Sequence, residues 1–460
     1  MYFELKTYKF FQEGILALSR MEQQGLRIDM KYAEEKKLEL TKEIEKLEVK
    51  FKETKLYKHW AHTAKNKVNI YSPQQLGAFL YGTKKIKISK ETASGQGATD
   101  EEALQELGIP ELDILLRIKK LKKVRDTYLD AFVREQVNGI VHPFFNLHLV
   151  RTFRGSSDSP NFQNIPKRDK ETMEICRRAI LPRPGHQFVE LDYKQLEVRI
   201  SCCYNRDEQL KEDILAGDMH KEMAIRIFHI EDFNKETTGH SVLRSATKNG
   251  FIFPQFYGDY YKNCAVNLSY GWGHLPKNRK WKSTDGIEFE DGKLGAHLIS
   301  NGIKDLESFT QHIKTIEDYF WNVRYKDYTK WKERWWEQYQ RVGHITSMTG
   351  FNYQGVMKKN DVLNYPIQGS AFHCLLWSII QGIKVQVKEK WKSRLVSQIH
   401  DAIVMDVHPD ELEHVVKTMK RIMCEDIVKH WGWITVPLDV DVEIHNVNDS
   451  WADKPQKQLL

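Results

Sequence analysis

Two aspartates stand where strands are expected to end. Asp192 closes a short strand-like segment, residues 188–192, and the start of a helix follows it. Asp401 lies at the tip of a predicted hairpin, between the strand-like segments 395–399 and 403–407. A lone aspartate at a turn usually has only a structural role. Two carboxylates projected from neighbouring strand ends, however, could share a pair of divalent cations. Such a pair would activate an attacking oxygen and stabilise a leaving one in phosphoryl transfer.

Two cations form a second candidate feature. Arg244 and Lys248 are four residues apart, which places them on one face of a helix. Aromatic residues follow closely, among them Phe253 and Tyr257. Two cations next to aromatic rings suit a polyphosphate beside a stacked base. A surface helix bordering an aromatic core is the alternative, and this pattern alone would favour it.

The composition describes a folded protein with several parts. The chain has 460 residues, of which 41% are hydrophobic and 11% aromatic, so a mainly disordered state is excluded and two to four subdomains are expected. None of the six cysteines forms a Cys-x-x-Cys pair, so neither a zinc site nor a disulfide framework is indicated, and a reducing compartment is favoured. The sequence shows no run of eighteen apolar residues and no secretory signal, so no membrane association is expected.

Most of the predicted elements are helices. Residues 31–57 are predicted as one long helix that Asp29 caps, with an apolar stripe of Leu38, Leu40, Ile44, Leu47 and Phe51. Ser72 and Pro73 mark a further helix start, and another helix is predicted to open at Thr99. The other predicted elements are helices at 194–204, 207–216, 219–228, 305–340 and 410–430 and a strand near 436–444.

Positive charge is concentrated in the first part of the chain, although the net charge is only +7. A lysine-rich stretch covers residues 55–90, and six cations fall within nine residues at 117–125. Each run alone could be a solvated helix face. Two such runs favour a surface that binds phosphates.

Taken together, the order of these segments resembles family A DNA polymerases, the group of bacterial polymerase I and many bacteriophage replicases. Arg151–Pro166 is similar to the signature ahead of motif A, and Asp192–Arg199 to motif A itself. The segment from Arg244 and Lys248 to Gly258 resembles motif B, and Gln398–Asp401 resembles motif C. Gly217–His220 and Asn364–Ser370 also match in order, and weaker similarity extends over nearly the whole chain.

The resemblance implies an α+β fold shaped like a right hand, with an antiparallel palm sheet, helical fingers and a helical thumb. The palm would carry Asp192 and Asp401, and the fingers would carry the helix of motif B. The expected division is a lead-in at 1–30, a thumb at 31–134, palm segments at 135–206 and 356–460, and fingers at 207–355 with an insertion at 271–303.

The resemblance also implies a reaction, in which the 3′-hydroxyl of a primer attacks the α-phosphate of a deoxynucleoside triphosphate. Asp192, Asp401 and the backbone carbonyl of Tyr193 would hold two Mg²⁺ ions, which Mn²⁺ could replace. Lys248 would be a further catalytic residue, as a general acid toward pyrophosphate.

The remaining implied roles concern substrates, with primer–template DNA and deoxynucleoside triphosphates as partners. Glu197 would occupy the space of a ribose 2′-hydroxyl and so select deoxynucleotides. The nucleotide would contact Arg244, Lys248, His220, Phe253, Tyr257, Glu197 and Gln195. DNA would contact Arg154, Asn161, Gln163, Asn364, Gln368 and His400, with Lys119, Lys120, Lys122 and Lys123 on the thumb gripping the duplex backbone.

The chain departs from the family pattern in three places. Motif C continues with Ala402 where glutamate is usual, and Asp406 is not expected to replace that carboxylate. Asn360 stands where arginine is usual, which removes one expected minor-groove contact. In motif B, Tyr257 follows Lys248 by nine positions where eight are usual.

The extra residue of motif B must be absorbed locally, and Pro254 falls in the same helix. A bulge or kink is therefore predicted near Gly250–Pro254. If it precedes Phe253, that ring keeps the position facing the sugar; otherwise Ile252 takes it.

Three function classes remain to be separated. The leading prediction is a DNA polymerase, of bacteriophage type, acting in viral DNA replication in a bacterial cytoplasm without intrinsic 3′→5′ exonuclease activity. A separate exonuclease or a processivity factor is an expected possible partner. A single-subunit RNA polymerase is disfavoured by Glu197 and Phe253. A catalytically weak or inactive DNA-binding subunit with a polymerase fold is supported only by Ala402.

Overall fold

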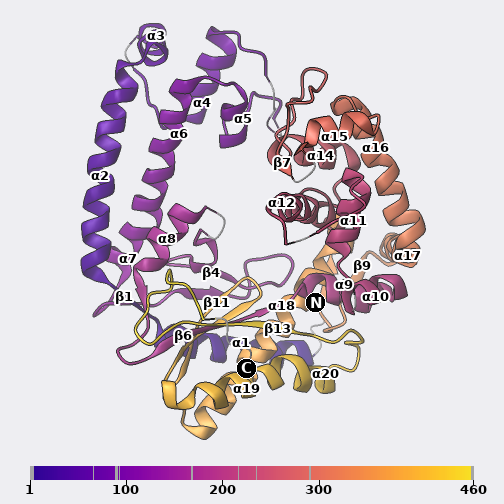
Figure 1. Ribbon diagram of the computed structural model, residues 1–460. Helices are drawn as coiled ribbons and strands as arrows, with labels where there is room; N and C mark the ends of the chain where they lie inside the picture. The colour runs from indigo at the N-terminus through magenta and orange to yellow at the C-terminus, as the bar shows by residue number, and fades with distance from the viewer. Residues whose placement is uncertain are drawn as a thin grey trace.

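The computed structural model describes residues 5–65, 67–88, 92, 94–166, 169–215, 217–234, 236–289 and 292–456. Lys90 of the predicted lysine-rich stretch lies outside these ranges. Helices and antiparallel strands combine in an α+β fold, which confirms the predicted class. Figure 1 shows a sheet in the lower half of the molecule, with helices below it and a helical arm rising on each side. Within the described ranges, no helix has the length and apolar character needed to cross a bilayer.

The main sheet has four antiparallel strands in the order β11-β12-β6-β13. The strand predicted at 188–192 and the hairpin predicted around Asp401 are both confirmed. The strand expected near 436–444 begins later than predicted. The bounds are β6 (Gln187–Tyr193), β11 (Arg394–Ile399), β12 (Ala402–Val407) and β13 (Val440–Ile444).

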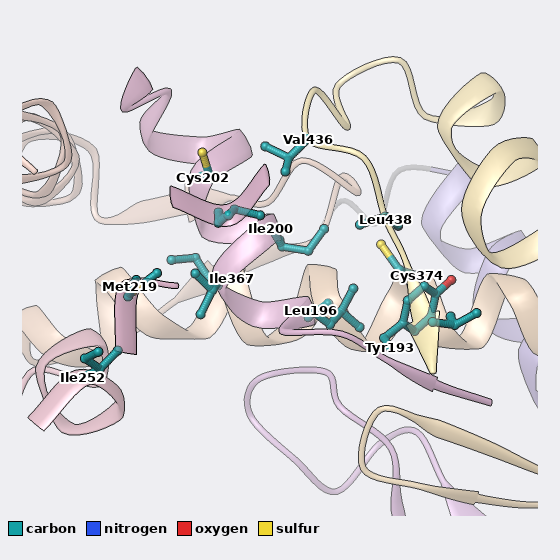
Figure 2. Packing of buried hydrophobic residues seen from close by; sticks show 14 of the residues in the cluster. Tyr193, Leu196, Ile200, Cys202, Met219, Ile252, Ile367, Cys374, Val436 and Leu438 are labelled. Carbon is teal, nitrogen blue, oxygen red and sulfur yellow. The ribbon is translucent and has the colours of Figure 1, made fainter. Parts of the chain in front are cut away.

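Side chains of β6 alternate between two hydrophobic cores. Val189, Leu191 and Tyr193 belong to one core together with α18 (Lys359–Glu389), whereas Phe188 belongs to the core of the thumb side. Figure 2 shows the ring of Tyr193 beside Cys374 of α18. The buried hydroxyl of Tyr193 lies 2.9 Å from the carbonyl oxygen of Met423 and donates to it. Since successive strand residues point to opposite faces, Asp192 is directed to the face away from α18.

The first arm consists of helices that we call the thumb helices, after the predicted division of the chain. Asp29 accepts a hydrogen bond from the Tyr32 N–H and Ser72 accepts one from the Gln75 N–H, so both predicted helix starts are confirmed. The thumb helices are α2 (Met30–Glu53), α3 (Lys55–Thr63), α4 (Pro73–Gly77), η1 (Ala78–Thr83), α5 (Glu101–Glu106), α6 (Pro110–Lys123), η2 (Val124–Leu129) and α7 (Asp130–Glu135).

The single helix predicted for residues 31–57 is wrong, because the chain turns at Thr54. The backbone of Thr54 is extended, with ψ of 153°, and its side chain accepts the N–H of Tyr57 to start α3. A threonine that satisfies backbone donors outside the helix competes with the helical conformation. Leu38 was also misassigned to the buried stripe, since 57% of its surface is exposed; Leu40, Ile44 and Phe51 are buried as expected.

The second arm contains the segments that we call the fingers. The helices predicted at 207–216 and 219–228 are confirmed, whereas the block at 305–340 divides into three pieces. The segments are α10 (Glu208–Leu215), α11 (Met219–Phe228), α12 (Thr238–Thr247), η4 (Lys248–Ile252), α13 (Phe253–Phe256), α14 (Tyr261–Val266), η5 (Asn267–Trp272), β7 (Glu288–Phe289), β8 (Gly292–Lys293), α15 (Leu294–Ser300), α16 (Leu306–Tyr319), η6 (Phe320–Arg324) and α17 (Lys326–Val342).

The other elements surround the main sheet. Helix α1 (Leu5–Gln24) packs on α18 and β11. The remaining ones are β1 (Leu26–Ile28), β2 (Ile140–Val141), β3 (Phe144–Asn146), β4 (Ser156–Asp158), η3 (Phe162–Asn164), α8 (Lys170–Arg178), β5 (Ile180–Leu181), α9 (Leu196–Asn205), β9 (His344–Thr346), β10 (Asn352–Gln354), η7 (Pro409–Glu411), α19 (Leu412–Arg421), η8 (Ile422–Asp426) and α20 (Ile427–His430).

Candidate active site

The fold brings the two predicted aspartates to the same end of the main sheet. Asp192 on β6 is the register partner of Ala402 on β12, the residue directly after Asp401. The N–H of Tyr193 donates to the carbonyl oxygen of Asp401 at 3.2 Å. Two residues that are 209 positions apart in sequence therefore lie on adjacent backbone segments, which are about 4.8 Å apart in a sheet. Both aspartates are half-buried.

A cavity of about 410 Å³ opens beside this end of the sheet, between β12, α9, α13 and α18. It is bounded partly by apolar rings and partly by polar side chains, as expected for a site that orients a small ligand. The predicted site residues that line it are Arg154, Gln195, Glu197, Phe253, Tyr257, Asn364, Gln368, His400 and Asp401.

Glu197 is the centre of a polar network in the cavity wall. Its two oxygens accept one hydrogen bond each, from Arg154 Nη1 at 3.1 Å and from the Tyr257 hydroxyl at 2.6 Å. Only 18% of the Glu197 side chain is exposed, whereas Tyr257 is 48% exposed, so the bond from Arg154 is the better shielded from water. Burial and the adjacent carboxylate raise the pKa of Tyr257, which keeps its hydroxyl a donor. The network thereby holds Tyr257 of the fingers against α9.

The extra residue of motif B is absorbed in a wide helical turn. In η4 the N–H of Phe253 donates to the carbonyl of Lys248, five residues earlier, as in a π-helix. Regular α-helix resumes at Phe253, with Pro254 in the first turn, where its missing N–H costs least. The predicted bulge is confirmed, and it precedes Phe253. Phe253 accordingly lines the cavity, whereas Ile252 is fully buried.

Behind Phe253 lies a cluster of cationic and imidazole groups. The Lys248 ammonium is 5.3 Å from the Phe253 ring centre, and the His220 ring is 6.4 Å from it, edge on. Arg244 Nε donates to Asp218 at 2.7 Å, and Arg244 Nη2 donates to His220 Nδ1 at 3.3 Å. The structure therefore brings Arg244, Lys248 and His220, all predicted to contact the nucleotide, together beside Phe253.

Electrostatics fix the charge states in this cluster. Burial and the charges of Arg244 and Lys248 lower the pKa of His220 to about 4, so His220 is neutral near pH 7. Because Nδ1 accepts from Arg244, the proton of the neutral ring lies on Nε2. Burial raises the pKa of Asp218, but hydrogen bonds from Arg244 and the Lys221 N–H outweigh it, so the pKa is lowered and Asp218 stays ionised.

Two asparagines of α18 hold the C-terminal end of the motif B helix. Asn364 Nδ2 donates to the carbonyl of Tyr257 at 3.0 Å, and Asn360 Nδ2 donates to that of Gly258 at 3.2 Å. Carbonyls at a helix end lack intrahelical partners, so these bonds cap the helix. Gly258 has a φ of +86°, and a Cβ there would lie 2.7 Å from Asn360, so only glycine fits. Asn360 thus has a structural role that the sequence did not reveal.

The hairpin tip is positioned by a chain of amides. Gln163 Nε2 donates to Gln398 at 2.8 Å, and the buried Gln398 donates to the carbonyl of His400 at 2.6 Å. His400 adopts a left-handed backbone, with φ of +51°, which turns the chain directly before Asp401. The structure places Gln163 beside the hairpin and leaves Asn161 exposed outside the cavity.

The residues at the sheet end fit a magnesium site. Mg²⁺ is commonly held by one or two carboxylates and completed by water and substrate phosphates. Asp192 and Asp401 supply two such carboxylates from adjacent strand ends. Among the described residues, no three histidine, cysteine, aspartate or glutamate side chains gather as a ready-made metal site. The donor set therefore suits ions that arrive with a phosphate ligand.

The predicted thumb lysines lie on α6, apart from the cavity. Lys120 pairs with Asp169 at 2.8 Å, and Lys122 pairs with Asp126 at 2.7 Å. Burial lowers the pKa of Lys119, while Lys123 is exposed. Partly exposed ion pairs contribute little to stability and exchange readily for phosphates. Their predicted role in DNA binding stays a prediction.

Two partnerships escaped sequence reasoning. Asp218 accepts a hydrogen bond from Arg244, although the Gly217–His220 motif had given no role to Asp218. Asp441 on β13 is the register partner of Asp192, and Lys194 pairs with Asp441 at 3.2 Å and with Asp439 at 2.7 Å. Only the strand register shows that these charges meet beside Asp192.

Comparison with known proteins identifies the family. The sequence profile of DNA polymerase family A matches residues 31–271 and 300–453. The chain belongs to DNA polymerase family A. The match is interrupted at 272–299, inside the expected insertion at 271–303.

Family relatives share most of this chain but are longer. DNA polymerase I of Lactococcus lactis subsp. cremoris is 28% identical over 390 residues, which are 84% of this chain and 40% of that protein. DNA polymerase I of Geobacillus stearothermophilus is 27% identical over 447 residues, 96% of this chain and 45% of that protein. The chain thus spans less than half the length of these relatives.

A solved structure confirms the polymerase fold. The POL domain of Pol1 from M. smegmatis, in complex with DNA primer-template and dNTP, superposes with a TM-score of 0.72 at 22% identity. The similarity covers 96% of this chain and 70% of that one. The right-hand architecture expected from the family motifs is therefore present.

Proposed function

We propose that this chain is a template-directed DNA polymerase that adds deoxynucleotides to a primer 3′-hydroxyl. The observation that carries the proposal is the joint placement of two features around one cavity. Asp401 lines the cavity beside Asp192, and Phe253 connects its opposite wall to the cluster of Arg244, His220 and Lys248. A nucleoside triphosphate has a base and sugar for the cavity and an anionic tail for the cluster.

Asp192 and Asp401, with the backbone carbonyl of Tyr193, would hold two Mg²⁺ ions, which Mn²⁺ could replace. When bound, these ions would lower the pKa of the primer hydroxyl and neutralise charge on the transferring phosphate. The Ala402 methyl group supplies no third carboxylate, so substrate phosphates must complete the coordination.

The triphosphate tail would be bound by charges that already lie together. Lys248 and Arg244 would contribute positive charge, and neutral His220 would donate from Nε2. Binding would compete with Asp218 for Arg244, so the nucleotide exchanges one carboxylate partner for phosphate oxygens. Lys248 would also protonate the leaving pyrophosphate.

The cavity wall would select the sugar and sense the base pair. Glu197 is held in place by Arg154 and Tyr257, so its carboxylate is a rigid obstacle to a ribose 2′-hydroxyl. Arg154, Gln368 and Asn364 would donate to minor-groove acceptors, which occupy similar positions in every correct pair. Asn364 would have to release the Tyr257 carbonyl to do so.

Primer extension with Mg²⁺ tests the proposal. Asp192→Asn and Asp401→Asn should each reduce extension at least about a thousandfold while primer–template binding persists, because loss of a metal ligand affects mainly the transition state. Asp410→Asn, an exposed carboxylate in η7, is the matched control and should extend like the parent. Undiminished extension by either active-site variant would show that the site is assigned wrongly.

The same assay separates the other function classes. Binding of primer–template without extension by the parent protein would favour the inactive subunit that Ala402 suggests. Incorporation of ribonucleotides as fast as deoxynucleotides would favour an RNA polymerase.

The proposal also includes a role in viral DNA replication in a bacterial cytoplasm. It further includes absence of proofreading and a separate exonuclease or processivity factor as partner. A primer with a mismatched end should not be shortened by the protein. A shortened primer would show intrinsic exonuclease activity.

A further inference from the structure

The segment that interrupts the family match is firmly folded onto the fingers. Trp281 is 95% buried, and its indole N–H donates to the carbonyl of Pro276 at 2.8 Å. The Leu275 N–H donates to the carbonyl of Ser269 at 2.7 Å, which ties the segment to η5. The Ile287 N–H donates to the carbonyl of Gly273 at 3.2 Å, which closes a loop within the segment. Lys277, directly after Pro276, is therefore presented from a fixed loop.

The opposing thumb tip is also fixed. Helix α5 buries Ala103 and Leu104 in the thumb, and Asp100 caps its start by accepting the Ala103 N–H. Glu102 and Glu106, one turn apart, lie on the side of α5 that meets the fingers. Figure 1 shows α5 opposite β7 and α14 at the end of the arms that is remote from the main sheet.

The two tips touch through an ion pair. Lys277 Nζ binds Glu106 Oε1, although their surroundings belong to different arms of the molecule. The Glu106 side chain is only 7% exposed and that of Lys277 27%, so water screens this pair less than most surface pairs. Lys277 also lies 4.2 Å from the ring centre of Tyr270, and burial together with the carboxylates of Glu106 and Glu102 raises the pKa of Tyr270.

The carboxylate of Glu106 has one oxygen in the ion pair and one oxygen to spare. Glu106 Oε2 is buried and accepts no hydrogen bond from any described residue. Nearby, Glu102 lines a cavity of about 460 Å³ together with Pro254, Tyr257 and Trp272 of the fingers. The thumb tip therefore forms part of the boundary of the space above the motif B helix.

We propose that the insertion and α5 form a latch that closes the two arms into a ring around primer–template DNA and retains the DNA between successive additions. The main sheet joins the arms at one end (Figure 1). The Lys277–Glu106 pair joins the insertion to α5 at the other end. A duplex bound in the ring leaves sideways only when the latch opens, whereas a free end slides through it. The proposal rests on the DNA polymerase activity proposed above and adds a retention function to the insertion.

Charge reversal tests the latch. Lys277→Glu and Glu106→Lys should each lower the number of nucleotides added per binding event about fivefold or more, with an unchanged rate of single-nucleotide addition. The double variant re-forms the pair in reverse and should regain most of the lost processivity. Lys293→Glu reverses a pair with Glu288 inside the same insertion and should behave like the parent. Equal processivity in all four variants, measured with a heparin trap, would overturn the proposal.

A covalent latch gives a second test. Lys277→Cys and Glu106→Cys, in a Cys424→Ser background because the other native cysteines are buried, can be joined by a short bis-maleimide. Joined before DNA is added, the protein should extend a short linear primer–template but not a primer on circular single-stranded DNA. Joined after binding, it should remain on the circle at least tenfold longer. Equal access to linear and circular DNA when joined would overturn the latch, whereas failure on both by the unjoined protein would refute the polymerase activity instead.

Discussion

Deleting Asn249 should convert the wide turn of the motif B helix into regular α-helix without moving the residues on either side. The N–H of Phe253 donates to the carbonyl of Lys248 five residues earlier. With one intervening residue removed, the same two groups form the bond that an α-helix makes over four residues. Asn249 is the residue to remove, because Gly250 packs against Leu268 so closely that a Cβ would lie 3.0 Å from it.

The expected magnitude follows from this geometry. Lys248 and Phe253 keep their orientation relative to each other, so kcat/KM for deoxynucleotides should stay within about tenfold of the parent. That limit corresponds to about 1.4 kcal/mol in activation free energy. The control is deletion of Ser245 in α12, which is regular α-helix without an extra residue in any turn. There Arg244 should turn by about 100° and shift about 1.5 Å relative to Lys248. A displacement of that size should cost about a hundredfold in kcat/KM.

Single-turnover incorporation measures both variants, and thermal unfolding shows that they are folded. A loss after Asn249 deletion as large as that after Ser245 deletion, at a similar melting temperature, would show that the prediction is wrong. The wide turn would then be required for nucleotide binding and would not be a tolerated insertion.

Two further predictions concern one partly buried and one fully buried polar group. Glu197→Ala should raise the relative incorporation of ribonucleotides about tenfold or more, because it removes the carboxylate that Arg154 and Tyr257 hold in place. Glu197→Gln keeps the side-chain volume and should retain most of the selectivity for deoxynucleotides. Equal discrimination by the parent and both variants would count against the assignment. His373 is fully buried and its pKa is lowered by burial to about 3, so the unfolded state binds more protons below about pH 6.5. Its stabilising contribution is therefore complete above pH 6.5 and is lost as the pH falls toward 3, by about 1.4 kcal/mol per pH unit. Urea unfolding between pH 7.5 and 5 should show stability falling as the pH falls in the parent and falling less steeply in His373→Gln, and identical pH dependence would contradict the prediction.

Local patterns predicted the parts of this fold that local physics controls. The apolar segment ending at Asp192 and the hairpin around Asp401 follow from strand periodicity and turn position. The bulge near Gly250–Pro254 was predicted from the extra residue relative to the family motif, and the structure shows that it precedes Phe253. The break at Thr54 was missed because its hydroxyl accepts the backbone N–H of Tyr57 and so starts a new helix. The spacing of apolar residues does not reveal such a cap.

The partners within the candidate site could not be predicted in the same way. Asp441 meets Asp192 only through the register of β13, and Asn360 meets Gly258 only through the packing of α18 on the fingers. Both depend on tertiary positions of residues far apart in sequence. The order of family motifs predicted which residues would surround a nucleotide, but not which of them bind each other in the structure.

The anchoring of the motif B helix at its C-terminal end has a mechanical consequence. Tyr257 and Gly258 are fastened to α9 and α18 by three hydrogen bonds, whereas Arg244 lies about 20 Å away along the helix. A helix fastened at one end pivots there and acts as a lever arm. A rotation of about 10° would sweep Arg244 through roughly 3.5 Å, enough to make or break phosphate contacts, while hardly displacing Tyr257.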